Sequence, residues 1–170
     1  MLDEKVGTLL NTQINKELYS AYLYMSFANY FQLKGLSGFS HWYDVQTQEE
    51  RDHALLFRQY LLNNDWPIIL NAIDMPENTF ADTLEPLEAG LAHEEYVTDL
   101  INTIYDAASE AKDYRTMQFL DWFIKEQGEE EENARGLIDK MKLFGIDPKG
   151  LYLLDQEYAA RIYSPPSLVL

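Results

Sequence analysis

A carboxylate and an imidazole stand one helical turn apart in the stretch Glu49-Glu50-Arg51-Asp52-His53. Residues three positions apart on an α-helix share a face, so Glu50 and His53 can direct their side chains to one point. Carboxylate oxygen and imidazole nitrogen together suit iron, manganese or zinc. Such pairs also arise by chance in a Glu-rich helical chain. The pair therefore predicts a metal site only if ligands from other elements reach the same point.

Other helical segments supply such ligands, because each has a polar interruption at the middle of its apolar face. Steps of three and four residues trace the face that a helical bundle buries. On these faces the mid-length polar residues are Glu17 in the first segment, Gln46, Glu50 and His53 in the second, Glu94 in the third, and Gln127 and Glu130 in the fourth. Four buried carboxylates would repel one another, and no basic residue lies on these faces at that level. We therefore predict that a metal lies between them.

The ligand pattern is typical of dinuclear carboxylate sites in helical bundles. Such sites use one Glu from each of two helices and a Glu-x-x-His motif from each of the other two, and Glu residues can bridge the two ions. Glu17 and Glu94 fit the single carboxylates, and Glu50 with His53 fits one motif. The fourth segment offers Gln127-Gly128-Glu129-Glu130 instead, so the second histidine is absent.

Four long segments with a helical period position these residues. We predict helices at residues 4–34, 37–64, 83–111 and 114–144. Lys34-Gly35-Leu36-Ser37 supplies a stop and then an N-cap at Ser37, so the first two helices should pack antiparallel. Residues 65–82 contain Pro67 and Pro76 and have no helical period, which predicts a long connection that crosses the bundle from end to end.

Capping residues predict the remaining boundaries. Asp82 is the expected N-cap of the third helix, with Glu85 at the capping-box position. Asp147-Pro148 begins a short amphipathic helix over about 148–162, which Pro165-Pro166 stops. The predicted fold is all-α: an antiparallel four-helix bundle over about 4–144, with a long crossover between helices two and three and a short fifth C-terminal helix. We expect one domain over residues 1–170.

Composition excludes several classes of function. The chain has 29 Asp and Glu against 13 Lys and Arg, a formal net charge of −16. This balance disfavours nucleic acid, because phosphate binding needs clustered cations, and it favours cationic partners. The absence of cysteine excludes disulfides and thiolate metal sites. With no basic leader and no apolar run of membrane-spanning length, we expect no membrane partner and a cytoplasmic location.

With these residues identified, the sequence resembles the bacterial non-haem ferritins over nearly its whole length. The similar motifs are Asn15-Lys16-Glu17-Leu18-Tyr19-Ser20-Ala21, Glu49-Glu50-Arg51-Asp52-His53-Ala54, Ala92-His93-Glu94, Glu126-Gln127-Gly128-Glu129-Glu130 and Gly150-Leu151-Tyr152-Leu153-Leu154-Asp155. The resemblance implies a ferritin-like fold and a ferroxidase that oxidises Fe(II) with O₂ or H₂O₂. It also implies that 24 identical subunits form a hollow shell in which ferric oxide-hydroxide mineral is stored.

The resemblance assigns roles to individual residues. It implies a first iron site at Glu17, Glu50 and His53, with Glu50 bridging to a second site that includes Glu94 and Glu130. Gln127 is implied beside this pair, and Tyr24, two helical turns after Glu17, would donate an electron or a hydrogen bond. A third iron site on the cavity side is implied at Glu49, Glu126 and Glu129, with help from Glu130.

Absent features narrow the resemblance. Bacterioferritins carry a second Glu-x-x-His motif and a haem-ligating methionine on the second helix; here Asp52 occupies the corresponding position, so no haem is expected. Rubrerythrins add a cysteine-rich iron domain, which this chain lacks. The resemblance assigns no iron-entry pore. Two other functions stay open here: a helical scaffold whose acids are surface charge, and a dinuclear oxidase or oxygenase that acts on an organic substrate.

Overall fold

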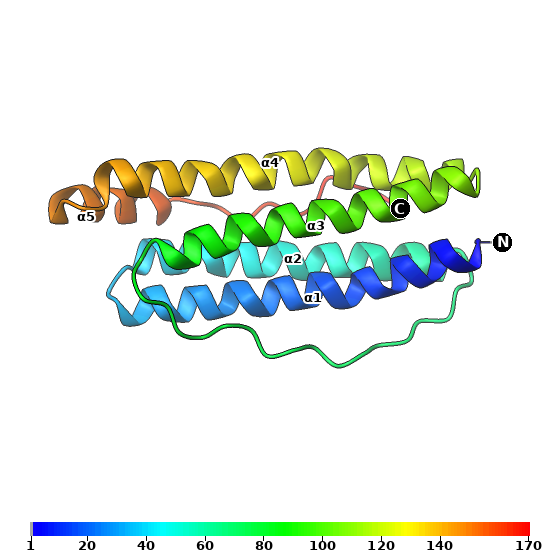
Figure 1. Cartoon of the computed structure of the whole chain (residues 1–170), viewed down its shortest axis with the longest axis horizontal. Coiled ribbons are helices and arrows are strands. Elements are labelled where there is room, and N and C mark those ends of the chain that lie inside the picture. Colours follow the sequence, from blue (N-terminus) through cyan, green and yellow to red (C-terminus); the bar gives the residue numbers. More distant parts are fainter. Residues whose placement is uncertain (1) are drawn as a thin grey trace.

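Five α-helices form the computed structural model, which describes residues 2–170. They are α1 (Glu4–Leu33), α2 (Ser37–Asn63), α3 (Glu85–Glu110), α4 (Tyr114–Phe144) and α5 (Pro148–Tyr158). Figure 1 shows α1 and α2 running side by side in opposite directions, as do α3 and α4, while α5 lies at one end of the bundle. The predicted all-α four-helix bundle with a short fifth helix is confirmed. No helix among the described residues combines the length and the apolar character that crossing a membrane requires.

The connection between α2 and α3 runs the whole length of the bundle along the outside of α1 (Figure 1). Polar residues on α1 bind its backbone. Asn11 donates from Nδ2 to the carbonyl oxygen of Ile69 and accepts the Ile69 N–H at Oδ1, both at 2.9 Å. Asn15 donates to the carbonyl oxygen of Ala72 at 3.0 Å. The crossover is therefore the one that the sequence predicts, and it makes α2 and α3 parallel.

Helix boundaries agree with the prediction to within one residue, except at the start of α3 and the end of α5, and the cap of α2 also differs. Gly35 stops α1 with φ +76°, but Ser37 is not the N-cap of α2 and is its first residue. The cap comes from α5 instead, because Oδ1 of Asp155 accepts the N–H groups of Gly38 at 2.7 Å and Phe39 at 3.0 Å. This long-range contact joins α5 to the start of α2.

The start of α3 and the end of α5 differ from the prediction by a few residues. The predicted cap Asp82 does accept the N–H groups of Leu84 at 2.8 Å and Glu85 at 3.0 Å, and the regular helix α3 begins at Glu85, two residues later than predicted. Helix α5 ends at Tyr158, four residues before the predicted end near 162. The next residues form turns, in which the N–H of Arg161 binds the carbonyl oxygen of Tyr158, and the Arg161 side chain contacts α2 at the carbonyl oxygen of Trp42.

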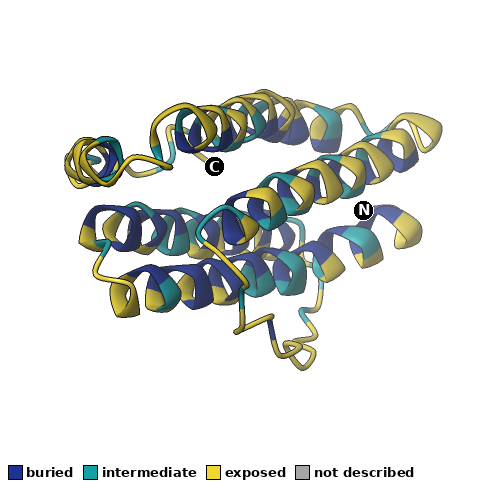
Figure 2. Ribbon diagram, turned by 60° about the vertical axis from the view of Figure 1, so that its left-hand side comes forward, coloured by how far each residue is buried: buried dark blue, intermediate teal, exposed yellow. Residues whose placement is uncertain are grey.

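Two apolar clusters fill the bundle, one on each side of its middle. The first contains fully buried residues such as Leu10, Phe57 and Leu120, and the second contains Phe27, Phe31 and Leu87 among others. Figure 2 shows the buried faces of the helices turned toward one another. Each such side chain contributes about 1.5–3 kcal/mol by leaving water. The polar residues at mid-length are therefore shielded from both ends of the bundle.

Candidate metal centre

The structure brings Glu17 of α1 together with Glu50 and His53 of α2. Each residue offers a ligand atom, and these atoms all lie within 4.8 Å of one another. The three residues are only 1%, 3% and 2% exposed, respectively. Glu50 and His53 share a face because they are one helical turn apart, and Nδ1 of His53 lies 3.4 Å from Oε2 of Glu50. The grouping that the sequence predicts is present, inside the bundle.

Glu94 of α3 and Glu130 of α4 complete the same buried layer. Gln46 links its two halves, because its Nε2 donates at 2.9 Å to Oε1 of Glu50 and at 2.9 Å to Oε2 of Glu130. Glu94 and Glu130 are 3% and 7% exposed. Four carboxylates and one imidazole thus lie at one depth, between the two apolar clusters.

Burial and mutual repulsion raise the pKa of three of these acids. Burial, reinforced by Glu50, raises the pKa of Glu17 to about 8 and that of Glu94 to about 8. Burial and the nearby Glu94 raise the pKa of Glu130 well above its ordinary value. The layer cannot hold all its negative charge unless it takes up protons or a cation.

In Glu50 and His53 the charged forms are favoured instead. Burial acts to raise the pKa of Glu50, but the hydrogen bond and charge of His53 outweigh it, so this pKa is lowered. Burial acts to lower the pKa of His53, but its bond to Glu50 and the charges of Glu50 and Glu17 raise it to about 10. Without a metal, the imidazolium supplies part of the positive charge that the acids need.

A fully buried oxygen of this layer has no hydrogen-bond partner. Gln13 donates to Oε1 of Glu17 at 2.8 Å, whereas Oε2 of Glu17 is fully buried and unpaired. Leaving a buried polar atom unpaired costs about 1–3 kcal/mol, and more for a charged group. A dication held by Glu17, Glu50 and His53 would supply the missing partner and neutralise the repulsion. The donor set of carboxylate oxygen and imidazole nitrogen suits iron.

Tyr24 and Gln127 both contact Glu94. The Tyr24 hydroxyl donates to Oε1 of Glu94, and its ring is buried against Tyr43 with the ring centroids 5.7 Å apart. Gln127 donates from Nε2 to Oε2 of Glu94 at 3.2 Å. Both side chains therefore lie in the layer, where the sequence predicts them, and each holds one oxygen of the same carboxylate.

The three acids expected at a third site are only partly brought together. Glu49 and Glu126 line one cavity of about 210 Å³ together with His53. Glu129 is not among its lining residues, and its carboxylate pairs with Lys125 at 3.2 Å on the exposed side of α4. Residues 164–167, which follow α5, form the opposite wall of this cavity.

Two residues to which the sequence assigned no role contact the layer. Gln46 lies on the predicted buried face, but nothing in the spacing assigns it a role. Arg161 lies beyond all the long helical segments, and it donates to Oε1 of Gln46 at 2.8 Å and to Glu49. The prediction that no basic residue lies on the helix faces holds, yet a cation reaches the edge of the layer from the chain after α5. Periodicity could not have revealed it.

Comparison with known proteins decides the family. Residues 7–144 match the family model described as ferritin-like domain. The chain belongs to the ferritin family. The bacterial non-heme ferritin of Campylobacter jejuni is 40% identical over 156 residues, which is 92% of this chain and 93% of that protein. The bacterial non-heme ferritin of Staphylococcus saprophyticus is 37% identical over 163 residues, covering 96% of this chain and 98% of that protein.

A solved ferritin structure has the same fold as this chain. The open pore ferritin of the hyperthermophilic archaeon Archaeoglobus fulgidus matches with a TM-score of 0.93 and 39% identity, covering 95% of this chain and 100% of that one. All the acids of the buried layer lie within the residues that match the family model, whereas Arg161 lies beyond them.

Proposed function

We propose that this ferritin is a ferroxidase that binds two Fe²⁺ ions as substrate in the buried layer, oxidises them and stores the ferric product. The observation that carries the proposal is the convergence of four buried carboxylates and an imidazole, with Oε2 of Glu17 unpaired. Such a group is costly in a core unless cations bind it. The relatives named bacterial non-heme ferritin support iron as the metal.

The residues divide between two ion positions. Glu17, Glu50 and His53 would hold the first Fe²⁺, and Glu94 and Glu130 the second, with Glu50 between the two. Each Fe²⁺ loses one electron, and O₂ takes both electrons with two protons to give H₂O₂, which can in turn oxidise more Fe²⁺. Anionic oxygen ligands stabilise Fe³⁺ more than Fe²⁺, so they lower the barrier to oxidation.

Neighbouring side chains would assist this chemistry. Tyr24 and Gln127 each hold one oxygen of Glu94, which keeps that carboxylate oriented toward the second ion. The Tyr24 phenol adjoins the centre and can donate an electron or a hydrogen bond. Glu49, Glu126 and Glu129 would receive a third iron; the cavity that Glu49 and Glu126 share with His53 supports this for the first two acids.

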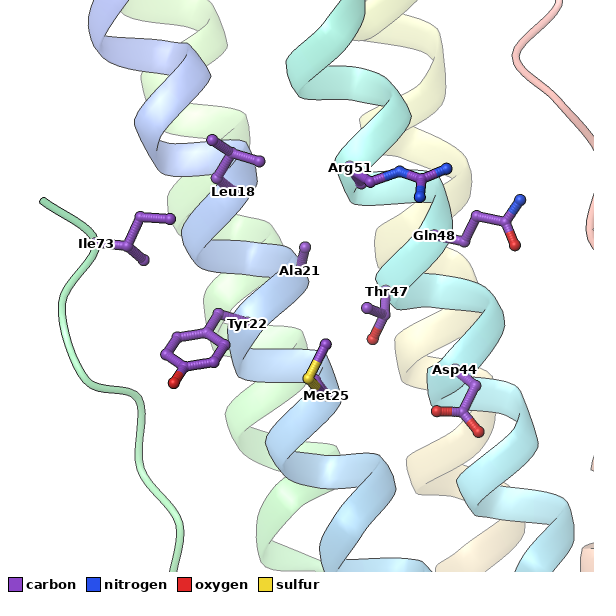
Figure 3. A pocket seen from close by; sticks show the side chains of 9 residues that line it. All are labelled: Leu18, Ala21, Tyr22, Met25, Asp44, Thr47, Gln48, Arg51 and Ile73. Atoms are coloured by element: carbon purple, nitrogen blue, oxygen red, sulfur yellow. The ribbon is translucent and has the colours of Figure 1, made fainter. Parts of the chain in front are cut away.

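Storage requires a shell, and we propose that 24 copies of this chain assemble into one. The outer face of α1 and α2 supports self-association: an apolar groove of about 370 Å³ lies there, lined by Leu18, Ala21, Tyr22, Met25 and Ile73 among others (Figure 3). Tyr22 and Met25 are 49% and 44% exposed in the single subunit. Exposed apolar residues also gather around α5, including Ile146, Tyr152 and Leu153. Apolar surface of this kind marks contact sites.

Substitution of the proposed ligands tests this function. The assembled protein is loaded anaerobically with Fe²⁺, air is admitted, and ferric absorbance is followed. Loss of a residue that only supports a metal ligand lowers metal affinity or activity about 10–100-fold. Glu50→Ala and His53→Ala, which remove ligands themselves, should therefore each slow the rapid phase of iron oxidation at least about tenfold. The matched control is Glu132→Ala, which removes an exposed acid of α4. Unchanged kinetics in Glu50→Ala and His53→Ala would refute the proposal.

A further inference from the structure

The chain after α5 lies back along the bundle beside α2 and α4 (Figure 1). We name residues 161–168 the C-terminal strap. The Tyr163 hydroxyl donates to Oδ2 of Asp52 on α2 at 2.5 Å, and Nε1 of Trp122 on α4 donates to Ser167 at 3.0 Å. Leu168 packs against the first apolar cluster. The strap is therefore attached along its length, and it begins at Arg161.

Arg161 is held in a single orientation by four contacts. Its Nη1 donates to the carbonyl oxygen of Trp42 at 3.2 Å and to Oε1 of Gln46 at 2.8 Å. Its Nη2 donates to Oε2 of Glu49, and the guanidinium stacks on the Trp42 ring 4.1 Å from the centroid. The side chain is only 14% exposed. A planar donor group bound on several sides can fix the partner that it binds.

Gln46 is the partner whose orientation matters. Its amide has an oxygen end that accepts and a nitrogen end that donates. The guanidinium has no acceptor, so only the oxygen of Gln46 can face Arg161. The nitrogen is then directed to Glu50 and Glu130, at 2.9 Å from each. Rotated by half a turn, the amide would present its oxygen to two carboxyl groups instead.

We propose that Arg161 is a positioning residue of the dinuclear site, which acts through the Gln46 amide on Glu50 and Glu130. The proposal rests on the proposed function. One oxygen of each carboxylate is held by Gln46, which leaves the other oxygen in a defined place to receive an ion. In Glu50 that other oxygen is Oε2, the one 3.4 Å from His53. The strap thus preorganises a site formed by helices distant in sequence.

Dication binding, measured apart from oxidation, tests the proposal. The assembled protein is titrated with Zn²⁺ in a calorimeter, and the initial rate of Fe²⁺ oxidation is measured against Fe²⁺ concentration. Arg161→Gln should weaken Zn²⁺ binding at the layer about tenfold, the size expected for a charge-assisted hydrogen bond. Arg161→Lys keeps the charge beside Glu49 and should recover part of this loss. The matched control is Tyr163→Phe, which removes the strap's bond to Asp52 and leaves Gln46 untouched; it should bind Zn²⁺ as the wild type does.

A double-mutant cycle identifies the route of action. In a Gln46→Leu background, Arg161→Gln should cause little further loss, because the amide through which Arg161 acts is already gone. The inference would be overturned if Arg161→Gln weakened Zn²⁺ binding equally in both backgrounds, or if Arg161→Gln alone bound Zn²⁺ as the wild type does. It would also be overturned if Tyr163→Phe weakened Zn²⁺ binding as much as Arg161→Gln. Failure of the proposed function is distinct from these results: wild-type protein and Glu50→Ala would then bind Zn²⁺ alike and oxidise Fe²⁺ alike.

Discussion

Binding of cations to the buried layer should release protons, because without cations the layer holds protons. Burial and Glu50 raise the pKa of Glu17 and Glu94 to about 8, so each carboxyl is about nine-tenths protonated at pH 7. Despite burial, Glu50 raises the pKa of His53 to about 10, and burial with Glu94 raises that of Glu130 well above its usual value. His53 is therefore protonated at pH 7, and the raised pKa of Glu130 favours the protonated form of that acid as well.

The expected proton count follows from these values. Dications bind carboxylate and neutral imidazole, so about three protons should leave Glu17, Glu94 and His53 as two ions enter at pH 7. At pH 9 Glu17 and Glu94 are already about nine-tenths ionised before binding, and the count from these three groups should fall to about one. Because fewer protons compete, cation affinity should rise as pH increases through 8.

Calorimetry in paired buffers measures the count. Zn²⁺, which undergoes no redox reaction, is added to two equivalents per subunit in buffers of equal pH and different ionisation enthalpy. The dependence of the observed heat on buffer enthalpy gives the number of protons released. Glu132→Ala serves as the control and should release as many as the wild type. Release of less than about one proton at pH 7, or a count that does not change between pH 7 and pH 9, would refute the assignment of protons to these acids.

Three further predictions concern stability. In protein stripped of metal, the melting temperature should fall as pH rises from 6 to 9 and should recover when Zn²⁺ is added. Acids with a raised folded-state pKa contribute stability that is fully present below their unfolded pKa and is lost as pH rises through their folded pKa of about 8. A melting temperature that does not change with pH in calorimetry would contradict this. Glu17→Gln should raise the melting temperature of the stripped protein by removing a buried acid, yet weaken Zn²⁺ binding at least about tenfold. A lower melting temperature together with weaker Zn²⁺ binding would count against a ligand role. Asp155→Ala should cost about 1–2 kcal/mol in denaturant unfolding, because Gly38 and Phe39 lose their shared cap, and a change below about 0.3 kcal/mol would show that α5 does not stabilise α2 in this way.

Local sequence signals were sufficient to predict the helices and the acids of the layer. Helical periodicity and Gly35 locate α1 and α2, and the one-turn spacing of Glu50 and His53 already places both on one face. Glu17 and Glu94 stand out because each is a lone carboxylate on an otherwise apolar face. These inferences need only a helix and its buried side.

Contacts between distant segments could not be derived in this way. Asp155 caps α2 from a position 117 residues after Gly38, so the local pattern wrongly favoured Ser37. Arg161 reaches Gln46 from 115 residues away, and no spacing rule connects them. Both contacts depend on where α5 docks, which is set by packing and by the turn that ends α5. The acids and the imidazole of the layer were thus predictable from sequence, whereas the contacts that Asp155 and Arg161 make from the chain after α4 were not.

The location of bound iron tests the central claim most directly. Crystals of the assembled protein are exposed anaerobically to Fe²⁺, and anomalous scattering at the iron edge locates the ions. We expect two peaks per subunit inside the bundle, one among Glu17, Glu50 and His53 and one between Glu94 and Glu130. Iron found only on the outer faces of the helices, with no peak in the buried layer, would contradict the account.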